Sequence, residues 1–257
     1  MRREASSSAG FRIAERLIGE GLVVAAIFGW WFLARGLPEF ILPNPLAVGT
    51  RLVDLFVTPE FLQHTLASTW RVIVAVAAAL IIGGALAFLA QAVPVLATVV
   101  DERIKPVLNS FPSIGWAILA AIWFEPGDFG VVFVEVAILI PFCLINIGEG
   151  LHNIDRELME MGRSFTRRPA RILWRLTLPL LVPYLLSALR IAYGIAWKIA
   201  LVSELLGAPS GLGYLMLRAQ TAADSTTFLA TCFAIVVIFV AGERLVIVPL
   251  ERRFAQR

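Results

Sequence analysis

The stretch ELMEMGRSFTRRPARILWRLTLPLLVPY, residues 157–184, lies between two long apolar parts of the chain and carries five arginines. Its first half has apolar residues at helical spacing with charged residues around them, which predicts an amphipathic helix. The apolar positions are Ile154, Leu158, Met161 and Phe165. Residues 166–168 break this helix before Pro169, because the residue before a proline disfavours helix whereas proline itself suits a first turn. A second short helix is then expected to lead into the next apolar segment.

The composition around this stretch is typical of a membrane protein. The chain has 257 residues, of which 59% are hydrophobic and 16% are charged, and its mean hydropathy is +0.82. An average soluble domain has about 25% charged residues. We therefore expect an integral membrane protein.

Six apolar segments have about the length of 20 residues that a helix needs to cross the hydrocarbon core of a bilayer. They are residues 17–35, 66–90, 104–124, 129–148, 178–206 and 227–249. Lipid offers no hydrogen bonds to the backbone, and the segments lack the alternating pattern of a barrel, so helices are expected. The predicted fold is all-α, with six transmembrane helices in one domain over residues 17–257, core helices at about residues 66–249, and a short segment of residues 1–16 before it.

Lysine and arginine are distributed unevenly between the two sides of such a bundle. With six spans both termini share one side, and most cations fall there: Arg2, Arg3, Arg12, Arg16, Arg103, Lys105, six arginines from Arg156 to Arg175, and Arg252, Arg253 and Arg257. The other side holds only Arg35, Arg51 and Arg218. Cytoplasmic loops carry the excess of Lys and Arg, so the termini and residues 149–177 are predicted to face the cytoplasm. This asymmetry accounts for the cations without a nucleic-acid partner.

Two short helices are expected on the opposite, outer side. Asn44 is suited to cap a helix that begins at Pro45, where the missing N–H of proline costs nothing. Turn residues after the fifth apolar segment lead to a second candidate, around Tyr214–Gln220. Neither helix contains a credible catalytic set.

The sequence offers no catalytic or metal-binding constellation. Cys143 and Cys232 both fall in predicted spans, where free cysteine packs as a small apolar residue. A phosphate-binding loop needs Gly-x-x-x-x-Gly-Lys-[Ser/Thr], but the only lysines, Lys105 and Lys198, do not follow a glycine. We expect no enzyme activity and no metal or cofactor in this chain.

Charged residues within the spans are the candidates for a pathway, because such residues usually face a cavity or one another. Arg190, Trp197 and Glu204 recur at seven-residue steps along one helix face, and Lys198 lies beside them. Either this face lines a pathway, where Arg190 or Lys198 attracts an anion, or the charges pair with neighbouring helices or extend to the interfaces. Arg71, near the outer end of the second span, is either an outer-mouth cation or an interface anchor.

Residues 157–184 resemble the cytoplasmic coupling loop of the binding-protein-dependent ABC transporter permeases, whose pattern is Glu-Ala-Ala, then Gly, then Leu-Pro. Glu160, Met161 and Gly162 fall on the Glu-Ala-Ala positions and Leu178-Pro179 on the Leu-Pro, while Thr166 replaces the glycine. The stretches LPNP, HTLASTWRV, NSFPSIGWAILAAIWF and WKIALVSELLGAPSGLGYL also resemble the nitrate, sulfonate, taurine and bicarbonate group of these permeases. Their order and spacing extend the resemblance over nearly the whole chain.

This resemblance implies the type I importer fold and a membrane-spanning subunit of an ATP-driven importer in the bacterial inner membrane. Two copies of the chain would work with two separate ATPase subunits, which bind ATP and Mg²⁺, and with a periplasmic or lipid-anchored solute-binding protein. The implied solute is a small anion of the sulfonate, nitrate or bicarbonate class. The implied coupling residues, within a loop of about residues 149–177, are Glu157, Glu160, Met161, Gly162, Arg163, Phe165, Thr166, Arg167, Arg168, Leu173, Leu178 and Pro179.

A protein of another class, a self-contained channel or ion-coupled carrier, is the alternative. Its basic loop would bind anionic lipid instead of an ATPase, because basic amphipathic helices commonly lie on membrane surfaces.

Overall fold

The computed structural model describes the backbone of residues 2–255 and the side chains of residues 18–254, except those of residues 94, 101, 108, 109 and 156. Arg257, and the side chains of Arg2, Arg3, Arg12, Arg16 and Arg156, therefore lie outside the described residues. Within the described part all regular structure is helical, as predicted.

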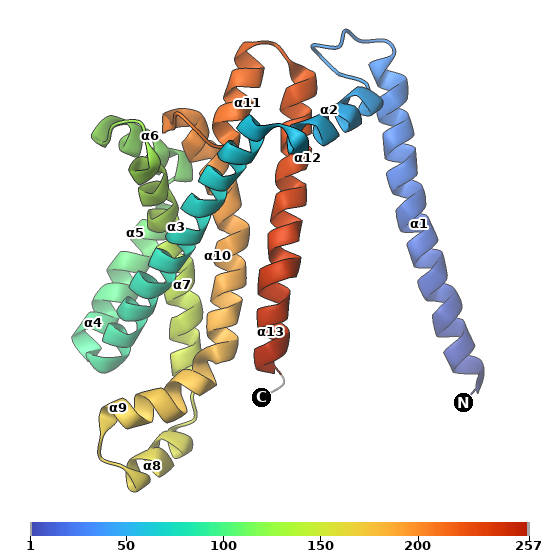
Figure 1. Ribbon diagram of the computed structural model, residues 1–257. Coiled ribbons are helices and arrows are strands. Elements are labelled where there is room, and N and C mark those ends of the chain that lie inside the picture. Colours follow the sequence, from blue (N-terminus) through green and yellow to red (C-terminus); the bar gives the residue numbers. More distant parts are fainter. Residues whose placement is uncertain (1, 256–257) are drawn as a thin grey trace.

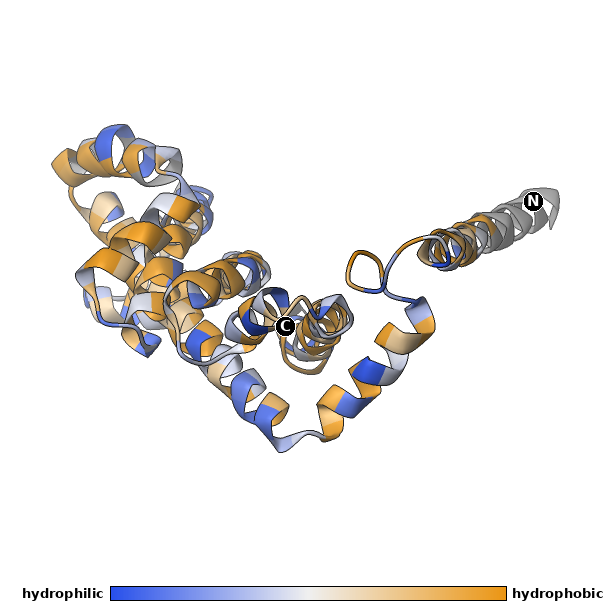
Figure 2. Cartoon of the chain, turned by 90° about the horizontal axis from the view of Figure 1, so that it is seen from above, coloured by the Kyte–Doolittle hydropathy of each residue, from blue (hydrophilic) through white to orange (hydrophobic). Residues whose placement is uncertain are grey.

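The first helix, α1 (Arg2–Ala34), stands apart from the other helices over most of its length and is joined to them through a loop and α2 (Pro45–Val57) (Figures 1 and 2). Near the end of α1, Trp30 stacks on Phe233 with ring centroids 6.1 Å apart. The remaining elements are α3 (Pro59–Ala92), α4 (Pro94–Val99), the π-helical turn η1 (Val100–Ile104), α5 (Lys105–Ser110), α6 (Ser113–Trp123), α7 (Asp128–His152), α8 (Arg156–Phe165), α9 (Pro169–Ile172), the π-helical turn η2 (Leu173–Thr177), α10 (Leu178–Gly207), α11 (Leu212–Thr221), α12 (Ser225–Gly242), the π-helical turn η3 (Glu243–Ile247) and α13 (Val248–Ala255).

Four helical stretches of the described residues are long and apolar enough to cross a membrane: Pro59–Ala92, Asp128–His152, Pro169–Gly207 and Ser225–Phe254. They correspond to the second, fourth, fifth and sixth predicted spans. The first predicted span forms a shorter apolar helix, Ile18–Ala34. An integral membrane protein is confirmed, whereas the count of six spans stays a prediction.

The third predicted span, residues 104–124, is wrong as a single helix. The chain forms α5 and α6 there, and between them Phe111 and Pro112 are extended, with ψ angles of 125° and 134°. The residue before a proline is pushed out of the helical region by the proline ring, so Pro112 ends α5 at Phe111. The hydropathy of the segment, which suggested one span, carries no information about this break.

Each π-helical turn of the described chain ends two residues before a proline. Lys105-Pro106, Leu178-Pro179 and Val248-Pro249 follow η1, η2 and η3 respectively. A proline within a helix lacks the N–H and its ring collides with the carbonyl four residues earlier, and a one-residue widening of the turn is a way to accommodate both. The helices consequently continue through these prolines into α5, α10 and α13.

Small residues allow α3, α7 and α10 to pack closely as the core of the bundle. A Cβ atom at Gly83 on α3 would lie 2.8 Å from the Cβ of Cys143 on α7, so only glycine fits at this crossing. On α10, Ala192, Ala196 and Ala200 are fully buried at four-residue spacing. Small residues at helix contacts are typical of membrane proteins, and the packing role predicted for Cys143 is confirmed.

The two short helices predicted on the outer side are present as α2 and α11, while their outer position stays a prediction. Asn44 caps α2, since its Oδ1 accepts a hydrogen bond from the backbone N–H of Leu46 at 2.9 Å, and Pro45 is the first helical residue. Figure 1 shows α2 and α11 at one end of the bundle, with α8 and α9 at the other end. The chain therefore presents two distinct polar ends on either side of its apolar helices.

Candidate functional site

The segment α8–α9 is a pair of short consecutive helices beyond the apolar part of the bundle (Figure 1). The Asp155 side chain caps α8 by accepting from the N–H of Glu157 at 2.9 Å. Thr166 is extended and ends α8, and its hydroxyl accepts from the N–H of Arg168 at 3.3 Å. Pro169 then begins α9. The predicted helix, break and second helix are all confirmed.

Gly162 allows α8 to pack closely on η2. A Cβ atom at this position would lie 2.8 Å from Cδ2 of Leu176 and 3.9 Å from Cγ2 of Ile172. On the same side of α8, the sulfur of Met159 lies 4.0 Å from the Thr177 hydroxyl. The inner face of α8 is thus packed on η2, which continues into α10 and connects this segment to the membrane-spanning core.

The outer face of the segment is apolar and exposed. Phe165 is 83% exposed, Met161 49%, and Trp174 on η2 71%. The predicted coupling cations and acids surround this face and are also exposed: Glu157, Glu160, Arg163, Arg167 and Arg168. Leu173 and Leu178 are half-buried, and Pro179 is exposed at the start of α10. The structure therefore brings the predicted coupling residues together in one protruding unit.

At the opposite end of the bundle, Arg71 on α3 is almost fully buried and uses all of its guanidinium donors. Its Nε and Nη2 donate to Asp128 Oδ1 at 2.8 and 2.5 Å. Its Nη1 donates to Glu204 Oε1 and to the Ser210 carbonyl oxygen, both at 2.7 Å. The remaining bond runs from Nη2 to the Ser210 hydroxyl at 2.7 Å. With five bonds for the five N–H donors of an arginine, Arg71 has no donor left for a solute in this conformation.

Glu204 on α10 is the central acceptor of this cluster and is 0% exposed. Besides Arg71, it accepts from the Ser68 hydroxyl at 2.7 Å and from the backbone N–H of Gly213 at 2.9 Å. Gly211 makes this approach possible, because its φ of 113° lies in the left-handed region and a Cβ there would collide with the Glu204 carboxylate. The buried charge is thus fully bonded by α3 and by the turn before α11.

The remaining predicted pathway residues lie elsewhere. Arg190 is half exposed and pairs with Glu243 at 2.9 Å and Glu251 at 3.4 Å, far along α10 from Glu204. Trp197 is buried between these two ends, whereas Lys198 is exposed on another face. Of the predicted set, only Arg71 and Glu204 meet. For Glu204 and Arg190 this agrees with the alternative that the charges pair with neighbouring helices, whereas a buried pairing of Arg71 was not predicted.

Sequence reasoning missed the other members of this cluster, Ser68, Asp128 and Ser210. His64 lies beside this cluster, where its Nδ1 accepts from the N–H of Gly211 at 2.9 Å. The available signals were the three-residue spacing of Ser68 and Arg71, which places both on one helix face, and the two glycines that follow Ser210. Neither signal specifies the partner helices.

The fold and these sites define a membrane-spanning, all-helical protein with a polar cluster buried at one end and an exposed amphipathic unit at the other. Residues 86–248 match the family described as the binding-protein-dependent transport system inner membrane component. The match covers more than half of the chain, which therefore belongs to this family. It is a permease subunit of the ABC transporter type, a transport component rather than an enzyme.

Several named relatives align over most of the chain. The putative aliphatic sulfonates transport permease protein SsuC of Escherichia coli (strain K12) is 29% identical over 218 residues, covering 81% of this chain and 78% of the relative. The taurine transport system permease protein TauC of the same strain is 26% identical, covering 92% and 86%. A probable ABC transporter permease protein of Brucella melitensis biotype 1 is 27% identical, covering 94% and 98%. Among solved structures, a chain of the MetNI methionine ABC transporter in an inward-facing conformation has a TM-score of 0.48 at 17% identity, covering 76% of this chain and 99% of that chain.

Proposed function

We propose that this permease works in an ATP-driven importer for a small anionic solute, with α8 and α9 docked on a separate ATPase subunit. The proposal includes a complex of two permease copies, two ATPases and an external solute-binding protein. In that complex, closure of the ATPases would be transmitted through α8 and η2 into α10. The chain itself contributes the transport pathway and no cofactor, since ATP and Mg²⁺ belong to the ATPase.

The exposed face of Phe165, Met161 and Trp174 carries this proposal. Phe165 and Met161 lie on α8, outside the four long apolar stretches, and Trp174 lies on η2, near the start of Pro169–Gly207. Exposed apolar groups of this size mark interaction surfaces. Aromatic anchors surrounded by polar groups are the usual centres of binding energy in protein interfaces. The adjacent arginines suit an acidic surface on the partner.

The distribution of charge supports a cytoplasmic position for this surface. The start of α1 and the end of α13 lie at the same end of the molecule as α8 (Figure 1). Arg163, Arg167, Arg168, Arg171 and Arg175 all belong to that end. Under the positive-inside rule, we place this end in the cytoplasm of a bacterium, with the chain crossing the inner membrane several times and α2 and α11 on the outer side.

The solute class rests on the relatives and on one cation. Two relatives are named for aliphatic sulfonates and taurine, both of which are small sulfonates. Lys198 is exposed on α10, and no ion pair links it to another described side chain. We infer that Lys198 faces the pathway and attracts the sulfonate group, whereas Arg190 is retained by Glu243 and Glu251.

Replacing Phe165 with serine tests the docking role. The side chain is exposed, so the fold should persist, while loss of an aromatic anchor typically weakens an interface by about tenfold or more. We expect less ATPase to co-purify with Phe165→Ser and ATP-dependent uptake of taurine or ethanesulfonate to fall. Phe40→Ser is the matched control, because Phe40 is 62% exposed in the loop before α2, at the other end of the molecule.

The same variant separates the alternative function. If α8 and α9 only bind lipid, as in a self-contained channel or carrier, Phe165→Ser should weaken binding of the isolated segment to anionic vesicles and leave ATPase association unchanged. Uptake without any ATPase would likewise favour that alternative.

A further inference from the structure

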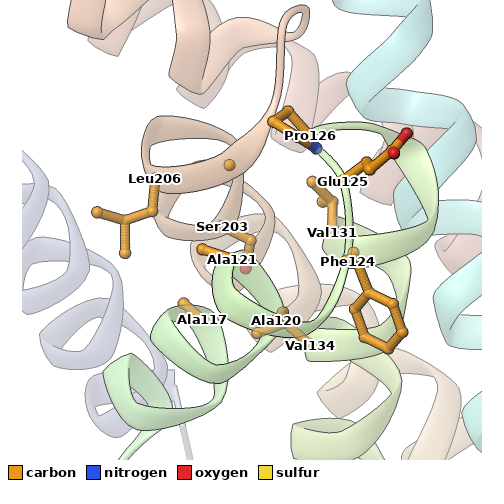
Figure 3. A pocket seen from close by; sticks show the side chains of 12 residues that line it. Ala117, Ala120, Ala121, Phe124, Glu125, Pro126, Val131, Val134, Ser203 and Leu206 are labelled. Carbon is orange, nitrogen blue, oxygen red and sulfur yellow. The ribbon is translucent and has the colours of Figure 1, made fainter.

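A small cavity lies between α6, α7 and α10, near the end of the bundle that contains Arg71 (Figure 3). It encloses about 80 Å³, several times the roughly 10–15 Å³ that one water requires. Most of its wall is aliphatic, formed by Ala117, Ala120, Ala121, Val131, Val134 and Leu206. The cavity therefore has room for a few non-hydrogen atoms of an apolar group.

Ser203 is the polar exception in this wall. Its side chain lies beside the alanines of α6 in Figure 3, and the residue is 4% exposed. The Ser203 hydroxyl has no hydrogen-bond partner among the described residues. A buried hydroxyl without a partner costs free energy, so the cavity is suited to an occupant that brings one hydrogen-bonding group.

The charge of the lining limits what this occupant can be. The wall contains no lysine or arginine, and its one acid, Glu125, turns its carboxylate away from the alanines (Figure 3). Burial of an anionic group here would lack a compensating charge. An ammonium group would be equally uncompensated, because the Glu125 carboxylate points away, so the cavity suits the uncharged end of a small molecule.

The cavity also lies next to the buried cluster of Arg71. Ser203 precedes Glu204 on α10, and the lining residues Gly130 and Val131 follow Asp128 on α7. The Arg71 bonds to Glu204 and Asp128 therefore join the two helices that form opposite walls. Any movement of α7 against α10 at this end would change the size of the cavity.

We propose that this cavity receives the tail of a short sulfonate that ends in a hydroxyl, with the Ser203 hydroxyl bonding that terminal group. The inference rests on the proposed function and adds a specificity-determining residue to it. A two-carbon chain matches the aliphatic wall, and the serine hydroxyl both donates and accepts, so it can bond a terminal hydroxyl in either direction. The sulfonate remains outside the cavity.

Uptake by the complete complex in proteoliposomes tests this assignment. The probes are ethanesulfonate and 2-hydroxyethanesulfonate at concentrations below saturation, so that the ratio of their rates reports specificity. Ser203→Ala should lower the preference for the hydroxylated probe about two- to tenfold, the effect of one lost hydrogen bond. Ser187→Ala is the matched control, since Ser187 is an exposed serine on the same helix. A ratio in Ser203→Ala equal to that of the wild type would overturn the assignment.

A labelling experiment gives a readout that does not depend on transport. With Cys143 and Cys232 replaced by alanine, Ser203→Cys should react with methyl methanethiosulfonate, and 2-hydroxyethanesulfonate should slow that reaction. The same sulfonate should leave labelling of Ser187→Cys unchanged. Absence of protection at position 203 would contradict the subsite.

A complex that retains its ATPase but moves neither sulfonate would overturn the solute class of the proposed function, whereas normal uptake with an unchanged ratio would overturn the subsite alone.

Discussion

Arg71 Nη1 lies 2.7 Å from Glu204 Oε1, and the two side chains are 1% and 0% exposed. A buried ion pair recovers its cost of desolvation only when further hydrogen bonds satisfy both partners. Here Asp128 and Ser210 accept the remaining hydrogen bonds of the arginine. Ser68 and Gly213 donate further hydrogen bonds to the glutamate. The pair thereby fixes α3 to α10 and to the turn before α11.

Replacing only one partner of this pair should destabilise the protein strongly. Arg71→Met leaves Glu204 buried without its cation, which typically costs about 3–5 kcal/mol. Thermal unfolding in detergent should show a large fall in melting temperature. The double variant Arg71→Met with Glu204→Gln should recover part of the lost melting temperature, because position 204 then carries no unpaired buried charge. A single variant as stable as the wild type would show that the pair is not a structural unit.

Gly211→Ala should disrupt the turn that approaches Glu204. A left-handed φ costs a non-glycine residue about 1–2 kcal/mol, and the added Cβ collides with the carboxylate. Gly207→Ala is the control, because nothing lies within 4 Å of a Cβ there and the φ of Gly207 is not in the left-handed region. The melting temperatures of both variants measure the effect, and equal values would refute the close approach.

The contact between Gly162 and Leu176 should be necessary for the shape of the α8–α9 unit. Gly162→Leu places a large side chain where Leu176 Cδ2 would already lie 2.8 Å from a Cβ. We expect this variant to insert into the membrane but to retain less ATPase on co-purification. Adding Leu176→Ala should restore association by making room, and a failure of that rescue would place the defect elsewhere.

Lys198→Met should raise the taurine concentration required for half-maximal uptake. Lys198 is exposed, so its removal strands no described carboxylate and assembly with the ATPase should persist. The effect should be modest, because a transit site must release its solute. Normal uptake kinetics in a well-assembled Lys198→Met complex would exclude Lys198 from the pathway.

Local signals predicted the local structure well. The Asn44-Pro45 cap, the break at Thr166 before Pro169, and the exposed face of Met161 and Phe165 all depend on neighbours in the sequence, so they could be read from spacing and side-chain chemistry. The break at Pro112 had an equally local signal, but the hydropathy of residues 104–124 outweighed it. The steric effect of Pro112 on Phe111 decides the backbone at this position, whereas hydropathy does not.

The pairing of buried charges could not be predicted in the same way. The seven-residue spacing of Arg190, Trp197 and Glu204 correctly places them along one helix, but the charged partners come from α3, η3 and α13, which no spacing specifies. Glu204 finds Arg71 133 residues earlier in the chain, whereas Arg190 finds Glu243 and Glu251. Only the packing of the helices decides which charges meet.

Photocrosslinking at Phe165 tests the central claim most directly. A photoreactive phenylalanine analogue at this 83% exposed position, in membranes that also contain the ATPase, should form a covalent adduct with the ATPase. The same analogue at Phe40 should form none. An adduct at Phe165 and its absence at Phe40 is the result that we predict. A complex that takes up solute while Phe165 yields no ATPase adduct would contradict docking through α8 and α9.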